Sequence, residues 1–179
     1  MSILEKFSVW LWNRAFVKKT NQQRIPRARN TDAIKSALLI YDADGDQQSR
    51  KYLEAWLEDQ GIRTDLLGIT GAGLQKSQPA KAGLMYRNDF HFWYEAKSPA
   101  IPDIIRASHD VLICMADIHG RKADLLAAMA NSPYKAGPDR EFNRPAYDLL
   151  FKFKPNTTDL RERALSIIKI FNEIKYEKV

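Results

Sequence analysis

The chain has 179 residues, of which 45% are hydrophobic and 28% charged, a composition typical of one folded domain with an extension and not of a disordered protein. A single cysteine, Cys114, excludes a disulfide framework and a cysteine-based metal site, which favours a reducing, cytoplasmic location. The first 30 residues carry seven of the 28 basic side chains but one of the 22 acids, so the whole net charge of +6 lies in this segment.

Residues 1–30 are predicted to form a basic helical arm that ends in an irregular linker. Apolar residues fall on two different faces of the expected helix, and such an unbalanced cationic segment predicts an anionic partner. The basic side chains are expected to contact phosphates: Lys6, Arg14, Lys18, Lys19, Arg24, Arg27 and Arg29. Four large aromatic residues are expected to fill grooves of the partner: Phe7 and Trp10 on one face, Trp12 and Phe16 on the other.

Residues 31–179 are predicted to form a single α/β domain. The apolar runs at residues 37–41 and 111–115 are typical of strands buried on both faces, and a turn and an amphipathic helix follow each run. The remaining predicted elements are strands over 62–69, 134–137 and 146–153, a short strand or packed loop over 90–94, and a final helix with an apolar stripe over 160–174. This alternation predicts a doubly wound, mostly parallel sheet of about five strands, flavodoxin-like or Rossmann-like.

Ligands of doubly wound sheets bind beyond the carboxyl ends of the strands, where this sequence places several acids. The apolar strand followed by Asp42-Ala43-Asp44-Gly45 resembles the nucleophile motif of haloacid dehalogenase-like phosphatases. The resemblance implies a nucleophile at Asp42, a general acid and base at Asp44, phosphate binding at Thr70 and a Mg²⁺ ligand at Asp117. The alternative interpretation is a solvated turn that caps the next helix, with no catalytic residue, no metal and no cofactor.

Aromatic and histidine residues outside the arm also allow two interpretations. Phe90, Phe92, Trp93 and Tyr94 suit a stacking platform for single-stranded RNA, but core packing is favoured because bulky aromatic residues supply much of the burial in small domains. His119 follows a predicted strand and is expected to be chemically inert, because no nucleophile with an orienting partner accompanies it.

Several short segments together resemble an uncharacterised family of Bacteroidota proteins, catalogued as a domain of unknown function. The matching segments are the basic N-terminal helix, Ala37 to Asp42, Phe92-Trp93-Tyr94, and residues 110–113, 135–137 and 147–150. The family supplies no catalytic residues. The resemblance therefore implies a cytosolic α/β domain with a basic N-terminal extension.

The sequence favours a non-enzymatic docking protein whose arm associates with RNA or with a ribosome. The first alternative is a protein of the membrane surface, with Trp10 and Trp12 at the level of the lipid headgroups. Basic residues interrupt one apolar face of the arm, which weakens that alternative. The second alternative is the Mg²⁺-dependent phosphatase. A further interpretation is that the two apolar faces pack on the chain's own domain and on a second copy, which gives a homodimer.

Overall fold

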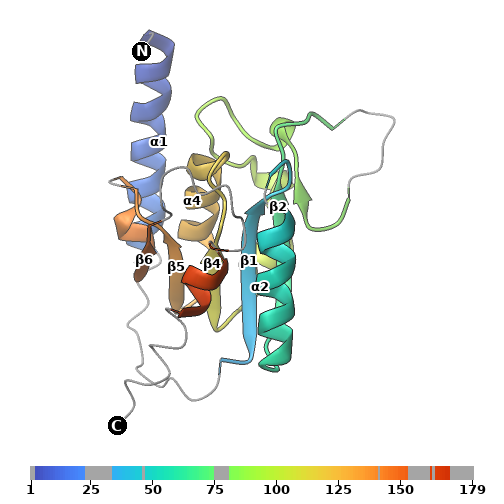
Figure 1. Cartoon of the computed structure of the whole chain (residues 1–179). Coiled ribbons are helices and arrows are strands. Elements are labelled where there is room, and N and C mark those ends of the chain that lie inside the picture. The colour runs from blue at the N-terminus through green and yellow to red at the C-terminus, as the bar shows by residue number, and fades with distance from the viewer. Residues whose placement is uncertain are drawn as a thin grey trace.

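The computed structural model describes residues 3–22, 34–45, 47–74, 81–140, 142–152, 162 and 164–169 (Figure 1). The helices are α1 (Ile3–Gln22), α2 (Gln47–Asp59), α3 (Asp103–Arg106) and α4 (Gly120–Met129), with 3₁₀ turns at Arg87–Asp89, Ser98–Ala100 and Arg144–Ala146. The strands are β1 (Ser36–Asp42), β2 (Arg63–Ile69), β3 (Leu84–Met85), β4 (Val111–Cys114), β5 (Tyr134–Pro138) and β6 (Leu149–Phe151). Of the predicted final helix, residues 162 and 164–169 are described, and they are helical.

The strands form one six-stranded sheet in the order β3-β2-β1-β4-β5-β6, and every neighbouring pair is parallel. This confirms the predicted doubly wound α/β fold and adds the short strand β3. The segment over residues 90–94 is a packed loop that holds one isolated antiparallel bridge, between Phe90 and Ala96. The strand order reverses direction between β1 and β4, so their carboxyl ends mark the position where such sheets bind ligands.

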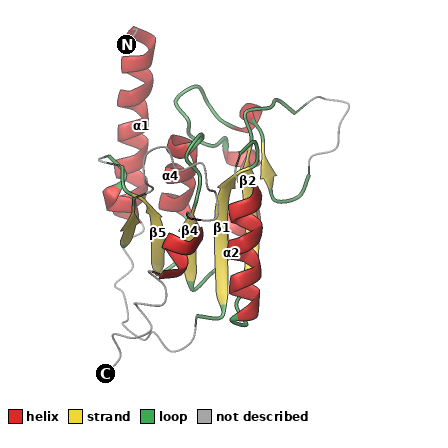
Figure 2. Ribbon diagram, in the orientation of Figure 1, coloured by secondary structure: helices red, strands yellow, loops and turns green. Residues whose placement is uncertain are grey.

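Side chains of the central strands alternate between two apolar layers. Leu38 and Ile40 of β1 pack with α1, α3 and α4, whereas Leu39 packs with α2 and with helical residues 164–168. Helices therefore cover both faces of the sheet (Figure 2). This cover on both faces explains the unbroken apolar run of β1, because a strand between two layers of helices has no solvent-facing position.

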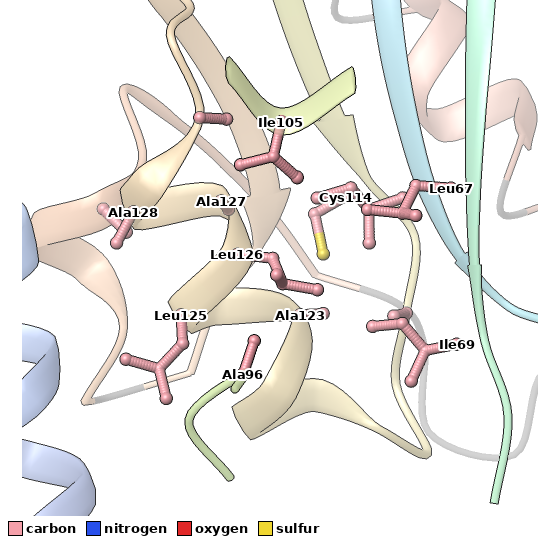
Figure 3. Packing of buried hydrophobic residues seen from close by; sticks show 14 of the residues in the cluster. Leu67, Ile69, Ala96, Ile105, Cys114, Ala123, Leu125, Leu126, Ala127 and Ala128 are labelled. Carbon is pink, nitrogen blue, oxygen red and sulfur yellow. The ribbon is translucent and has the colours of Figure 1, made fainter. Parts of the chain in front are cut away.

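The single cysteine lies in the larger of these layers. Figure 3 shows Cys114 of β4 among Leu67, Ile105 and Leu126, and its side chain is fully buried. Burial raises the pKa of the Cys114 thiol to about 12. The thiol therefore stays protonated at neutral pH and acts as a small apolar side chain of the core.

Helix α1 packs on the rest of the chain through one of its two apolar faces, beside α4 (Figure 1). Trp12 and Phe16 are 1% and 2% exposed, and their rings stack with centroids 4.6 Å apart. The indole N–H of Trp12 donates to the carbonyl oxygen of Arg121 at 2.9 Å. The edge of the Phe142 ring meets Trp12 at 5.2 Å between centroids. These contacts bury the face of α1 that carries Trp12 and Phe16.

The prediction that Trp12 and Phe16 anchor a partner is therefore wrong, because α4 and Phe142 already cover them. The homodimer interpretation places one apolar face of the arm on its own domain and the other on a second copy. The first of these contacts is present, and the contact with a second copy stays a prediction. The other apolar face remains open: Phe7 is 49% exposed and Trp10 is 53% exposed. The predicted boundary at residue 30 lies outside the described residues.

Candidate functional site

The residues that resemble a phosphatase motif come together at the carboxyl edge of the sheet. Asp42, at the end of β1, accepts hydrogen bonds from the backbone N–H groups of Asp117, Ile118 and His119 at 2.6, 2.8 and 3.0 Å. Both carboxylate oxygens take part, and the side chain is buried. Asp42 therefore ties β1 to the loop that follows β4.

The second acid of the turn, Asp44, connects the same edge to β2. Its carboxylate accepts hydrogen bonds from the Thr70 hydroxyl and from the Gly71 N–H, and Nε2 of His119 lies 3.0 Å from it. Partial burial acts to raise the pKa of Asp44, but the hydrogen bonds from Gly71, Thr70 and His119 outweigh it and lower the pKa to about 2. Asp44 is thus an ionised acceptor shared by three segments.

These contacts do not fit the Mg²⁺ site that the phosphatase resemblance implies. Three N–H groups take three of the roughly four lone-pair directions of the Asp42 carboxylate. Within the described ranges, no group of three or more His, Cys, Asp or Glu side chains is arranged to hold a metal ion. The predicted residues are neighbours, and their contacts are those of a structural junction between strands.

Acid is expected to weaken this junction through Asp44. Its pKa of about 2 in the fold lies below the ordinary 3.8, so its stabilisation is complete above about pH 4 and is lost as the pH falls from about 4 to 2. The side chain is 41% exposed, which limits the contribution to about 1 kcal/mol or less. Urea unfolding of the chain and of Asp44→Asn should differ at about pH 7, and the difference should shrink below about pH 4 and vanish only as the pH falls through about 2. A difference that stays unchanged from about pH 7 to about pH 2 would exclude this role.

A second candidate site consists of aromatic rings on α1 and on the loop over residues 90–96. Phe7 stacks on Trp10 and on Phe92, with ring centroids 6.0 and 6.5 Å apart. Phe92 meets Trp93 edge-on at 4.8 Å, and Trp93 stacks on His91 at 4.3 Å. We call these five residues the aromatic ladder. Phe92 is 60% exposed, so the ladder presents ring faces and edges to solvent at Trp10, Phe7 and Phe92.

Basic side chains surround the α1 part of the ladder. The guanidinium of Arg14 lies over the Trp10 ring, 5.8 Å from its centroid. Lys6 and Lys18 are also exposed, and the four-residue spacing of Lys6, Trp10, Arg14 and Lys18 places them along one side of the helix. The other predicted phosphate contacts, Arg24, Arg27 and Arg29, lie outside the described residues.

Polar contacts hold the loop against α1. The Ser8 hydroxyl donates to the carbonyl oxygen of Phe92 at 3.3 Å, and the Lys19 ammonium lies 3.7 Å from the Glu95 carboxylate. Lys19 is thus paired inside the chain, in contrast to its predicted contact with a phosphate. Phe90 is 6% exposed, which confirms core packing for this residue. For Phe92, core packing is wrong, because its ring faces solvent beside α1.

A family model matches residues 11–171 of the chain. The chain belongs to a family of unknown function, DUF6913. The DUF6913 match covers the whole sheet and α1 from Leu11 onward, so Phe7 and Trp10 lie just before it. No curated protein and no solved structure matches the chain. Among the described helices, none is long and apolar enough to cross a membrane.

Proposed function

We propose that this protein is a docking protein that binds single-stranded or looped RNA, free or within a ribosome, through the aromatic ladder and the basic side of α1. The observation that carries the proposal is the exposure of three stacked rings at Trp10, Phe7 and Phe92. Large apolar side chains exposed together on a folded protein commonly mark a binding surface. Unstacked bases offer flat apolar faces that match such rings.

The charges beside the ladder favour RNA over other partners. Lys6, Arg14 and Lys18 lie along the same side of α1 as Trp10, within reach of a backbone whose bases stack on the rings. A helix that lies flat on lipid separates its basic and apolar residues onto opposite faces, whereas here they alternate on one face. The mixture supports contacts with phosphates and bases at the same time.

Removal of two ladder rings is expected to weaken RNA binding. Each stacked base contributes about 1–3 kcal/mol, so the variant with Trp10→Ala and Phe92→Ala should bind a labelled single-stranded RNA of about ten nucleotides at least about 30-fold less tightly. Fluorescence anisotropy of the full chain measures this affinity. Leu165→Ala, at a leucine that is 43% exposed on the opposite face of the sheet, is the matched control and should bind normally. Equal affinities of all three proteins would remove the ladder from the site.

Salt is expected to weaken the same complex steeply. About five phosphate contacts predict a loss of roughly 10²- to 10³-fold in affinity between about 50 and 200 mM salt. A flat salt titration would contradict RNA docking and indicate an apolar protein partner. Stronger binding to anionic lipid vesicles than to RNA, abolished in the same double variant, would replace RNA with a membrane surface.

A further inference from the structure

A pocket of about 420 Å³ opens at the carboxyl edge of the sheet, beside the first turn of α4. Arg121 and Lys122 of α4 line it together with Arg140, which follows β5. Tyr94 and Phe142 form aromatic walls. Its volume lies within the range of about 300–1,000 Å³ that is typical of small-molecule sites. The pocket lies next to the point where the strand order reverses, and the phosphatase-like acids Asp42 and Asp44 do not line it.

Two of the three cations form no close ion pair among the described residues, although the carboxylates of Asp44 and Asp42 act on Lys122 from farther away. The Arg121 guanidinium lies between two rings, 5.5 Å from the centroid of Tyr94 and 5.8 Å from that of Phe142. The Lys122 ammonium lies 4.9 Å from the centroid of Phe90. Such contacts hold a cation in a partly dehydrated position without neutralising it. Burial lowers the pKa of Lys122, and the charges of Asp44 and Asp42 oppose this shift without cancelling it.

The third cation, Arg140, lines the same pocket. A Cβ atom on Gly120 would come within 2.7 Å of the Arg140 guanidinium carbon, so this group lies directly against the first residue of α4. The start of a helix already carries partial positive charge, and no side chain caps this one through its His119 position. Asp117, 3.4 Å from Arg140, is the one acid that lines the pocket. Arg140 also pairs with the buried carboxylate of Asp124 at 3.0 Å, so Arg121, Lys122 and the start of α4 supply the positive charge that is left for a ligand.

One residue of the pocket wall, Tyr94, has an unusual backbone conformation. Tyr94 has a φ of 69°, and within the described chain it is the non-glycine residue with a left-handed backbone. A bulky residue adopts this conformation at a cost in energy, and such residues concentrate at ligand sites. The ring of this same residue lies under the Arg121 guanidinium.

We infer that this pocket binds the phosphate group of a small aromatic phosphate ester, with Arg121 and Lys122 as its charge partners, Arg140 beside them, and the rings of Tyr94 and Phe142 against its apolar part. A phosphate dianion offsets several converging cations at once and fits the start of a helix. The site is distinct from the aromatic ladder, so it stands whether or not the chain binds RNA.

Titration with inorganic phosphate and with phenyl phosphate tests this site in the full chain. Backbone amide shifts in ¹H–¹⁵N NMR should change saturably at Gly120, Arg121 and Lys122, at about millimolar concentrations or below, with phenyl phosphate several-fold tighter than phosphate. Sodium chloride at matched ionic strength should not reproduce these shifts. Arg121→Gln and Lys122→Gln should each weaken binding about tenfold.

Arg63→Gln is the matched control for the loss of one positive charge, because this arginine is 74% exposed at the opposite end of the sheet. It should bind both phosphates as the unchanged chain does. Amide shifts that do not saturate, or that sodium chloride reproduces, would overturn the inference. So would an affinity that Arg63→Gln lowers as much as Lys122→Gln does. The variants remove exposed or half-buried side chains outside the ion-paired core, so the shifts of the remaining amides report directly whether the fold is intact.

Discussion

Replacement of Arg140 by methionine is expected to destabilise the fold by about 3–5 kcal/mol, because it leaves a buried carboxylate without its cation. Asp124 of α4 is 0% exposed. One guanidinium nitrogen of Arg140 donates to both of its oxygens, at 3.0 and 3.2 Å. Asn143 and the Tyr147 hydroxyl also donate to this carboxylate, at 3.0 and 2.8 Å, but they are neutral. Burial raises the pKa of Asp124, and the charge of Arg140 opposes that rise.

Urea unfolding measures this effect, and a second arginine supplies its control. Arg144 pairs with Asp139 at 2.9 Å but is 58% exposed, so Arg144→Met should cost about 1 kcal/mol or less. A second change, Asp124→Leu, added to Arg140→Met should recover a large part of the lost stability, since it removes the uncompensated charge. Similar losses for Arg140→Met and Arg144→Met would contradict the network as the source of stability.

Replacement of Trp12 by alanine is expected to cost about 3–5 kcal/mol, the range found for large aromatic residues in cores. The side chain is 1% exposed, and the change removes its stacking on Phe16, its contact with Phe142 and its hydrogen bond to Arg121. Loss of these contacts should release α1 from α4. Limited proteolysis should then cut within α1 at protease concentrations that leave the unchanged chain intact.

Trp10 provides the matched control in the same helix. It is 53% exposed, so Trp10→Ala should change the free energy of unfolding by no more than about 0.5 kcal/mol. The two variants thus separate the roles of the two apolar faces: Trp12 holds the helix on the fold and Trp10 is available to a partner. Equal stability losses would show that α1 is not attached through the Trp12 face.

The main elements of the fold follow from sequence periodicity alone. The apolar runs of β1 and β4 specify strands covered on both faces, and the alternation of such runs with amphipathic helices specifies a parallel sheet. The gathering of acids at one edge has the same origin, because the carboxyl ends of parallel strands meet there. These inferences use local patterns that a single sequence contains.

The choice between the two faces of α1 depends on tertiary contacts and could not be predicted. Both faces carry a tryptophan and a phenylalanine, so hydrophobicity does not distinguish them. Contacts with α4 and Phe142 bury Trp12 and leave Trp10 exposed. The pairing of Arg140 with Asp124 also depends on tertiary contacts. The two residues lie 16 positions apart, Asp124 in α4 and Arg140 after β5, and no local spacing indicates that they meet.

The exposure of Phe92 was missed for a related reason. Phe90 and Phe92 lie in a loop, where neither the helical nor the strand period assigns side chains to an inner or outer face. Packing of the loop against α1 turns Phe90 inward and leaves Phe92 on Phe7. A sequence signal for this arrangement is absent, because it requires contacts between residues about 80 positions apart, such as Ser8 with Phe92.

Photo-crosslinking of the full chain to RNA that contains 4-thiouridine tests the docking proposal most directly. Mass spectrometry of the crosslinked peptides locates the residues in contact with bases. We expect crosslinks at Phe7, Trp10 and Phe92, and we expect their yield to fall as salt rises from about 50 to 200 mM. Crosslinks spread over α2 and the opposite face of the sheet, with none at these three rings, would contradict the account.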